Sequence, residues 1–217
     1  MLKTVFAAAL CTALALTASS AMAAPISFHV QVDTASLIGS AEAPFALDFQ
    51  LNGGDPLGNL VTISNILFGG GAATNDPPAT GFGLAAGDLT SSVTLNDSSA
   101  SFSNEFFQGF VAGNTLSFDV YLTTNVNGPT PDVFAFTILD KNLFNIPTTG
   151  LGNSLLLVDL TSPSLGIGDV QTFHGTGAFS GVTVTATAVP EPTSLLLLGV
   201  GLAGGAARRW RRNGMRP

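Results

Sequence analysis

Hydrophobic and polar residues alternate along several segments of the chain between residues 26 and 188. A period of two is typical of a β-strand that buries one face and exposes the other. The most regular alternation spans residues 26–32, 45–51, 116–122 and 182–188, and less regular strands are expected at 60–68, 89–95, 101–111, 133–139, 154–160 and 169–175.

Clusters of Gly, Pro, Asn and Asp separate these segments and favour turns. Outside the two ends of the chain, no long stretch shows the 3.6-residue period of an amphipathic helix. Roughly ten strands with one apolar face each predict two antiparallel sheets that pack face to face. We therefore expect an all-β fold, an antiparallel β-sandwich that is jelly-roll-like or immunoglobulin-like, with a long loop over residues 69–88, which are rich in Gly, Pro and Ala.

The first 23 residues have the three parts of a secretory signal peptide. Lys3 supplies the positive charge, residues 5–18 form an apolar stretch, and Ala21 and Ala23 are the small residues of a cleavage site. Cleavage after Ala23 removes Cys11, the only cysteine. The exported chain then has no thiol for a disulfide, a nucleophile or a metal ligand.

A second apolar run covers residues 193–207. As a helix it would extend roughly 22 Å at about 1.5 Å per residue, which is short of the hydrocarbon core of about 30 Å. Long basic side chains after the run can reach the membrane surface and complete the span. Because basic residues stay on the cytoplasmic side, we expect a transmembrane helix with the body of the chain outside. The basic cluster consists of Arg208, Arg209, Arg211 and Arg212.

Pro190, Glu191 and Pro192 stand directly before this run. The order of tripeptide, short Leu- and Gly-rich span and terminal arginine cluster resembles the PEP-CTERM sorting signal of exported proteins from Gram-negative bacteria that make exopolysaccharide. The resemblance implies a membrane-embedded processing enzyme of the exosortase type, which cuts near the tripeptide. The stretches ISFHVQVDTASL, GNTLSFDVYLTT and FAFTILD also resemble uncharacterised body domains that carry this tail.

The resemblance also implies a route. The general secretion machinery exports the chain, and the tail holds it transiently in the inner membrane with its body in the periplasm. Processing then transfers the body to the outer surface or the extracellular matrix of a biofilm. The chain accordingly divides into a signal peptide at 1–23, a β-sandwich body at 24–189 and a sorting signal at 190–217.

The body is strongly acidic and poor in charge. Lys141 is its only lysine or arginine, against thirteen acidic residues, which makes a net charge of −12. Such a surface repels phosphate backbones, so we expect no nucleic-acid partner. Divalent cations remain compatible with it.

Catalytic signatures are missing from the body. His29 and His174 are its only histidines, and pairing either with Asp33 or Asp169 would be needed for an acid–base or metal site. The sequence contains no H-E-x-x-H, G-x-S-x-G or P-loop motif. The favoured interpretation is two unrelated surface histidines.

Paired carboxylates offer a second route to hydrolysis, because glycosidases use two acids on either side of the scissile bond. Asp48 and Asp119 lie on the polar faces of separate expected strands and could face each other. Glu42 and Glu105 are the only glutamates of the body. Solvated surface acids explain the same residues more simply, so we expect no enzyme and no catalytic residue.

We expect no cofactor; among ligands, calcium is the one that the sequence favours most. Asn52, Asp55 and Asn59 flank glycines and a proline in one tight segment that can gather side-chain oxygens. A turn without an ion explains the same residues.

Three functions stay open. The favoured one is a non-enzymatic structural or interaction protein of the cell surface and exopolysaccharide layer. The alternative is a polysaccharide-binding module, with or without the assistance of calcium. A degenerate hydrolase would require two acids, or a histidine and an acid, that converge in a cleft.

Overall fold

The computed structural model describes residues 26–53, 58–98, 102–123, 132–160 and 169–189. The expected signal peptide, the helix at 193–207 and the sorting motif lie outside these residues. In the described part of the chain, no helix has the length and apolar character needed to cross a membrane.

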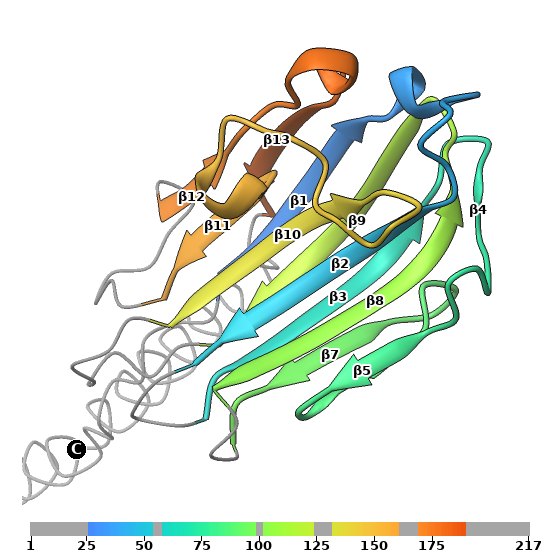
Figure 1. Ribbon diagram of the computed structural model, residues 1–217. Coiled ribbons are helices and arrows are strands. Elements are labelled where there is room, and N and C mark those ends of the chain that lie inside the picture. The colour runs from blue at the N-terminus through green and yellow to red at the C-terminus, as the bar shows by residue number, and fades with distance from the viewer. Residues whose placement is uncertain (1–25, 54–57, 99–101, 124–131, 161–168, 190–217) are drawn as a thin grey trace, which may run out of the picture.

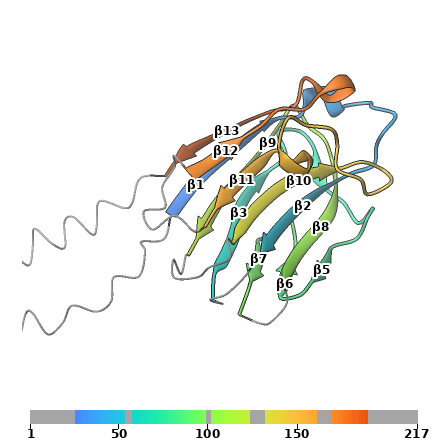
Figure 2. The same cartoon turned by 60° about the vertical axis from the view of Figure 1, so that its left-hand side comes forward.

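Two antiparallel sheets face each other and enclose the core (Figure 1, Figure 2). Sheet A has the order β13-β1-β9-β3-β7-β6, and sheet B has the order β12-β11-β10-β2-β8-β4, with β5 also paired to β8. The strands are β1 (Ile26–Asp33), β2 (Phe45–Asn52), β3 (Leu60–Leu67), β4 (Ala72–Ala73), β5 (Thr80–Phe82), β6 (Ala85–Gly87), β7 (Val93–Asn96), β8 (Ser103–Val111), β9 (Thr115–Leu122), β10 (Val133–Leu139), β11 (Leu156–Asp159), β12 (Val170–Thr172) and β13 (Thr183–Ala188). In the described part of the chain, short 3-10 helices accompany them at Ala35–Leu37, Leu151–Asn153 and Gly177–Phe179.

Residues that alternate in the sequence lie on opposite faces of each strand. In β9, Leu116, Phe118 and Val120 are buried, whereas Asp119 and Tyr121 point outward. The same arrangement holds in β1 and β3. The prediction of an all-β fold with antiparallel sheets is therefore confirmed.

Phenylalanine rings join the two sheets. Phe118 of sheet A contacts Phe49 and Phe136 of sheet B, with ring centroids 5.4 and 5.0 Å apart. Phe49 and Phe136 stack on each other at 5.3 Å. All three rings are fully buried, so large apolar side chains fill the space between the layers.

Two expectations about local structure are wrong. Residues 69–88 do not form one long loop, because β4 and β5 hydrogen-bond to β8, and β6 pairs with β7. Residues 89–92 do not extend β7. There the carboxylate of Asp88 accepts hydrogen bonds from the backbone N–H and the hydroxyl of Thr90, and this local turn ends the strand.

The chain enters and leaves the sandwich at the same end. Phe28 of β1 is paired with Ala188, the last residue of β13, and the N–H of Val189 donates to the carbonyl of Ser27 at 3.0 Å. We call this the proximal end; it also contains Asn59 and Asp132, which precede β3 and β10. The opposite, distal end contains Lys141, which follows β10.

Candidate functional site

A groove of about 400 Å³ lies on the outer face of sheet B. Its floor is the outward side of β10, where the small side chains of Ala135 and Thr137 leave space. Exposed Phe102 and Leu151 line it as well. The remaining lining residues are Gln50, Asn52, Val133, Asn145, Gly152, Ser154 and Leu157.

The 3-10 segment Leu151–Asn153 is fixed along this groove by hydrogen bonds. The hydroxyl of Thr137 donates to the carbonyl of Asn153 at 3.1 Å, and the amide of Asn145 donates to the carbonyl of Gly152 at 2.9 Å. The groove thus combines amide and hydroxyl groups with exposed apolar surface on ordered strands. This combination suits a neutral, polar ligand with apolar faces.

A carboxyl pair lies on the same sheet face. Asp48 and Glu105 come from the neighbouring strands β2 and β8, and Asp48 is only 1% exposed. Burial raises the pKa of Asp48 to about 7, with a further contribution from the charge of Glu105, although the amide of Gln50 donates to its carboxylate at 2.7 Å. Asp48 therefore binds a proton at neutral pH far more readily than an ordinary aspartate.

Asp48 and Asp119 do not face each other, contrary to the expectation. Asp48 belongs to sheet B and Asp119 to sheet A, and both point away from the core. Two carboxylates on opposite outer faces of a sandwich cannot act on one bond. The partner of Asp48 is Glu105.

His29 is paired with Asp119. From the sequence, we considered only Asp33 and Asp169 as its carboxylate partners. The Nδ1 of His29 lies 2.6 Å from a carboxylate oxygen of Asp119, and the amide of Asn65 donates to the other oxygen at 2.7 Å. Asn65 reaches this position from an irregularity of β3 and has a positive φ of 53°, which asparagine tolerates. Partial burial acts to raise the pKa of Asp119, but the hydrogen bonds from Asn65 and His29 and the charge of His29 together lower it.

The two histidines do not converge. His29 is paired with Thr187 and His174 with Thr183, four residues apart along β13. At about 3.3 Å per residue this separates their backbones by roughly 13 Å. The carboxylate of Asp33 instead accepts a hydrogen bond from the backbone N–H of Ala35 at 3.0 Å.

A second polar cluster lies between the sheets at the proximal end. Asn59, Asp97 and Asp132 are 1%, 0% and 5% exposed. The amide nitrogen of Asn59 donates to the carboxylate of Asp132, and the N–H of Gly58 donates to Asp97 at 2.5 Å. Burial is the main cause that raises the pKa of Asp97, and the charge of Asp132 adds to it, against hydrogen bonds from Gly58 and Asn59.

Of the three residues considered for calcium, the two that the structure describes face different sides of sheet B. Asn52 lines the outer groove of sheet B, whereas Asn59 faces inward, so the two lie on opposite sides of that sheet. Asp55 lies outside the described residues. The described part of the chain contains no group of three or more His, Cys, Asp or Glu side chains suited to a metal ion.

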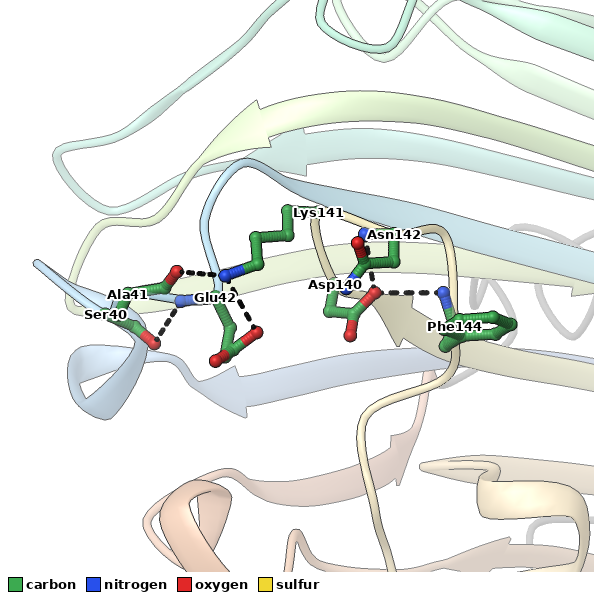
Figure 3. Close-up of polar contacts among 7 residues, drawn as sticks. All are labelled: Ser40, Ala41, Glu42, Asp140, Lys141, Asn142 and Phe144. Carbon is green, nitrogen blue, oxygen red and sulfur yellow. Dashed lines mark hydrogen bonds and ion pairs between the residues drawn. The ribbon is translucent and has the colours of Figure 1, made fainter.

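The single body lysine is held at the distal end (Figure 3). Its Nζ donates to the carbonyl of Ala41 at 2.9 Å and lies 3.4 Å from the carboxylate of Glu42. In the same loop, Asp140 accepts backbone hydrogen bonds from Asn142 and Phe144. Lys141 therefore joins two distal loops and lies away from the groove.

The fold and these sites describe an acidic, two-sheet β protein with a polar groove on one outer face. Residues 188–212 match the PEP-CTERM protein-sorting motif. The chain thus carries a PEP-CTERM sorting signal, which marks an exported protein that is routed through exosortase, a membrane enzyme. No curated protein and no solved structure matches the chain.

Proposed function

We propose that the body is a non-enzymatic structural or interaction protein of the cell surface and the exopolysaccharide layer. The observation that carries this proposal is the sorting motif, which begins where β13 ends at Ala188. In this arrangement the signal follows a completed sandwich. Processing near Pro190, Glu191 and Pro192 would release the body without cutting a strand of either sheet.

The geometry also favours a role without catalysis. Asp48, the carboxyl group whose pKa lies near neutrality, is too buried for a substrate to reach. His29 is held by Asp119 on the outer face of the other sheet. Acid–base chemistry requires its groups within hydrogen-bond reach of a bound substrate, and these residues do not share a cleft.

Processing can be tested by substituting one acidic residue. We expect Glu191→Ala to block cleavage at the C-terminus, so that intact mass measurement of the recovered protein shows a retained tail and fractionation shows it in the inner membrane. Glu42→Ala, an acidic residue of the distal end, is the matched control and should mature like the wild type. Normal maturation of the Glu191 variant, together with unchanged surface retention after deletion of residues 190–217, would contradict the proposal.

A second candidate function is polysaccharide binding in the groove of sheet B. It is favoured by the combination of Gln50, Asn52 and Asn145 with the exposed ring of Phe102. Amides can pair with sugar hydroxyls as donor and acceptor, and an aromatic ring can contact the apolar face of a sugar. The transient stages of the export route, in the inner membrane and the periplasm, belong to the first proposal, that of a sorted surface protein.

The groove offers a matched pair of phenylalanines for the test. Phe102 and Phe144 are both 70% exposed, but only Phe102 lines the groove. We expect Phe102→Ala to weaken binding to exopolysaccharide from the producing cells by about tenfold in a pull-down titration, and Phe144→Ala to leave it unchanged. Equal binding by both variants would exclude the groove as the binding surface.

A further inference from the structure

Three polar side chains enter the interior at the proximal end because of their position in the strand pattern. Asn59 continues the inward side of β3 that contains Val61 and Ile63. Asp97 continues the inward side of β7, and Asp132 that of β10. Two of them come from sheet A and one from sheet B, so the cluster lies between the layers.

Two oxygens of this cluster are buried without a hydrogen-bond partner among the described residues. They are Oδ1 of Asn59 and Oδ2 of Asp97, and both side chains are at least 99% buried. An unpartnered buried acceptor costs about 1–3 kcal/mol, and more when it is charged. Two such acceptors lie beside the carboxylate of Asp132. They indicate that a hydrogen-bond donor or a cation is needed here to satisfy these oxygens.

Among the described residues, no basic side chain is available for that purpose. Lys141 is the only lysine or arginine between residues 24 and 189. It follows β10, whereas Asp132 precedes the same strand. Nine residues at about 3.3 Å each place them roughly 30 Å apart along the chain direction. Lys141 is moreover already paired with Glu42.

The backbone approaches Asp97 closely at Gly53. A Cβ atom at Gly53 would lie 3.0 Å from the Cβ of Asp97 and 3.2 Å from its Oδ2. Glycine therefore leaves room beside the unpartnered oxygen that a larger side chain would fill. The N–H of Gly53 is used elsewhere, since it donates to the carbonyl of Phe102 at 2.8 Å.

We propose that Asn59, Asp97 and Asp132 bind one calcium ion between the two sheets. All three offer oxygen, the ligand atom that calcium prefers. Water and main-chain carbonyls complete the shell. Two carboxylates balance the charge of the ion, which removes their mutual repulsion and joins sheet A to sheet B.

The site can be measured on the full-length protein in detergent. After treatment with a chelator and dialysis, we expect one calcium ion per chain by isothermal titration calorimetry and by elemental analysis. We expect calcium to raise the midpoint of thermal unfolding by several degrees, because an ion bound only by the folded state stabilises it. Magnesium at the same concentration should act at least tenfold more weakly.

Matched variants distinguish the site from a general effect of charge. Asp97→Asn and Asp132→Asn should each weaken calcium binding by at least tenfold. Asp48→Asn removes an equally buried carboxylate from the outer face of sheet B and should keep wild-type binding. If the first two variants do not fold, Asn59→Asp supplies an independent measurement. This variant retains an oxygen ligand, so it should still bind calcium. It should also lower the stability of the calcium-free protein.

A shared proton is the competing explanation of the same geometry. In that case calcium would neither bind stoichiometrically nor shift the unfolding midpoint, and acidification would still stabilise the protein after Asp48→Asn removes the contribution of Asp48. That outcome would overturn the proposal, as would equal responses to calcium and magnesium or an unchanged calcium response in both Asp97→Asn and Asp132→Asn. The proposed function of the groove is unaffected by either result.

Discussion

At the scale of single residues, the carboxyl groups of this protein experience very different surroundings. Asp119 is held by His29 and Asn65 on an outer face, and its pKa is lowered. Asp48 is buried beside Glu105, and its pKa is raised to about 7. Burial, hydrogen bonds and the charges of the neighbouring His29 and Glu105 decide these differences, because the body has only one lysine and no arginine.

Asp48 makes stability depend on pH. Its pKa rises from 3.8 to about 7 on folding, so between these values the folded state binds more protons than the unfolded state. Stability therefore falls as the pH rises from about 4 to 7, by up to about 1.4 kcal/mol per pH unit. We expect Asp48→Asn to flatten this slope in urea unfolding at pH 5, 6, 7 and 8.

The control for this prediction is Asp33→Asn, which changes an exposed aspartate at the end of β1. It should keep the wild-type dependence on pH. At pH 8 the Asp48→Asn protein should be more stable than the wild type, by up to about 4 kcal/mol. A variant whose stability declined with pH like that of the wild type would assign the effect to a different group.

At the scale of the elements, the sheets are joined by aromatic contacts. Phe118 of β9 is the ring of sheet A that contacts both Phe49 and Phe136 of sheet B. Its neighbours on β9 alternate between the core and the surface. One strand can therefore provide both a core substitution and a surface control.

We expect Phe118→Ala to lower the free energy of unfolding by about 3–5 kcal/mol, because the cavity it leaves is enclosed on both sides. Tyr121→Ala on the outward face of the same strand should cost less than about 1 kcal/mol. Chemical denaturation of both variants measures the difference. Similar costs would show that the two layers are not held together through this ring.

At the scale of the whole molecule, the body and the sorting signal are separate along the chain. The main-chain hydrogen bond nearest the C-terminus among the described residues joins Val189 to Ser27, and the motif match overlaps the sandwich only in its first residues. The proximal end of the sandwich, which contains the proposed calcium site, is also the end from which the chain continues into the signal.

Removal of residues 190–217 should leave the body folded, because it breaks no described strand pairing of either sheet. We expect the truncated and full-length proteins to unfold cooperatively with midpoints within about 2 °C under the same conditions. Differential scanning calorimetry compares them. Loss of a cooperative transition after truncation would show that the tail is part of the fold.

The sequence alone determined the fold class and the sorting signal. Alternation in β1, β2, β9 and β13 is local information, because a side chain's face follows from its position along the strand. The motif at 188–212 is likewise read along the chain. Neither requires knowledge of which strands are neighbours.

Only the tertiary structure decided which polar residues meet. Asp48 with Glu105, His29 with Asp119 and Asn59 with Asp132 are separated by 57, 90 and 73 positions in the sequence. Their proximity depends on strand order and register, which side-chain alternation does not specify. The same topology separated Asn52 from Asn59, two residues that the sequence placed in one loop, because Asn52 lies on the outer face of sheet B and Asn59 precedes β3 of sheet A and faces the interior.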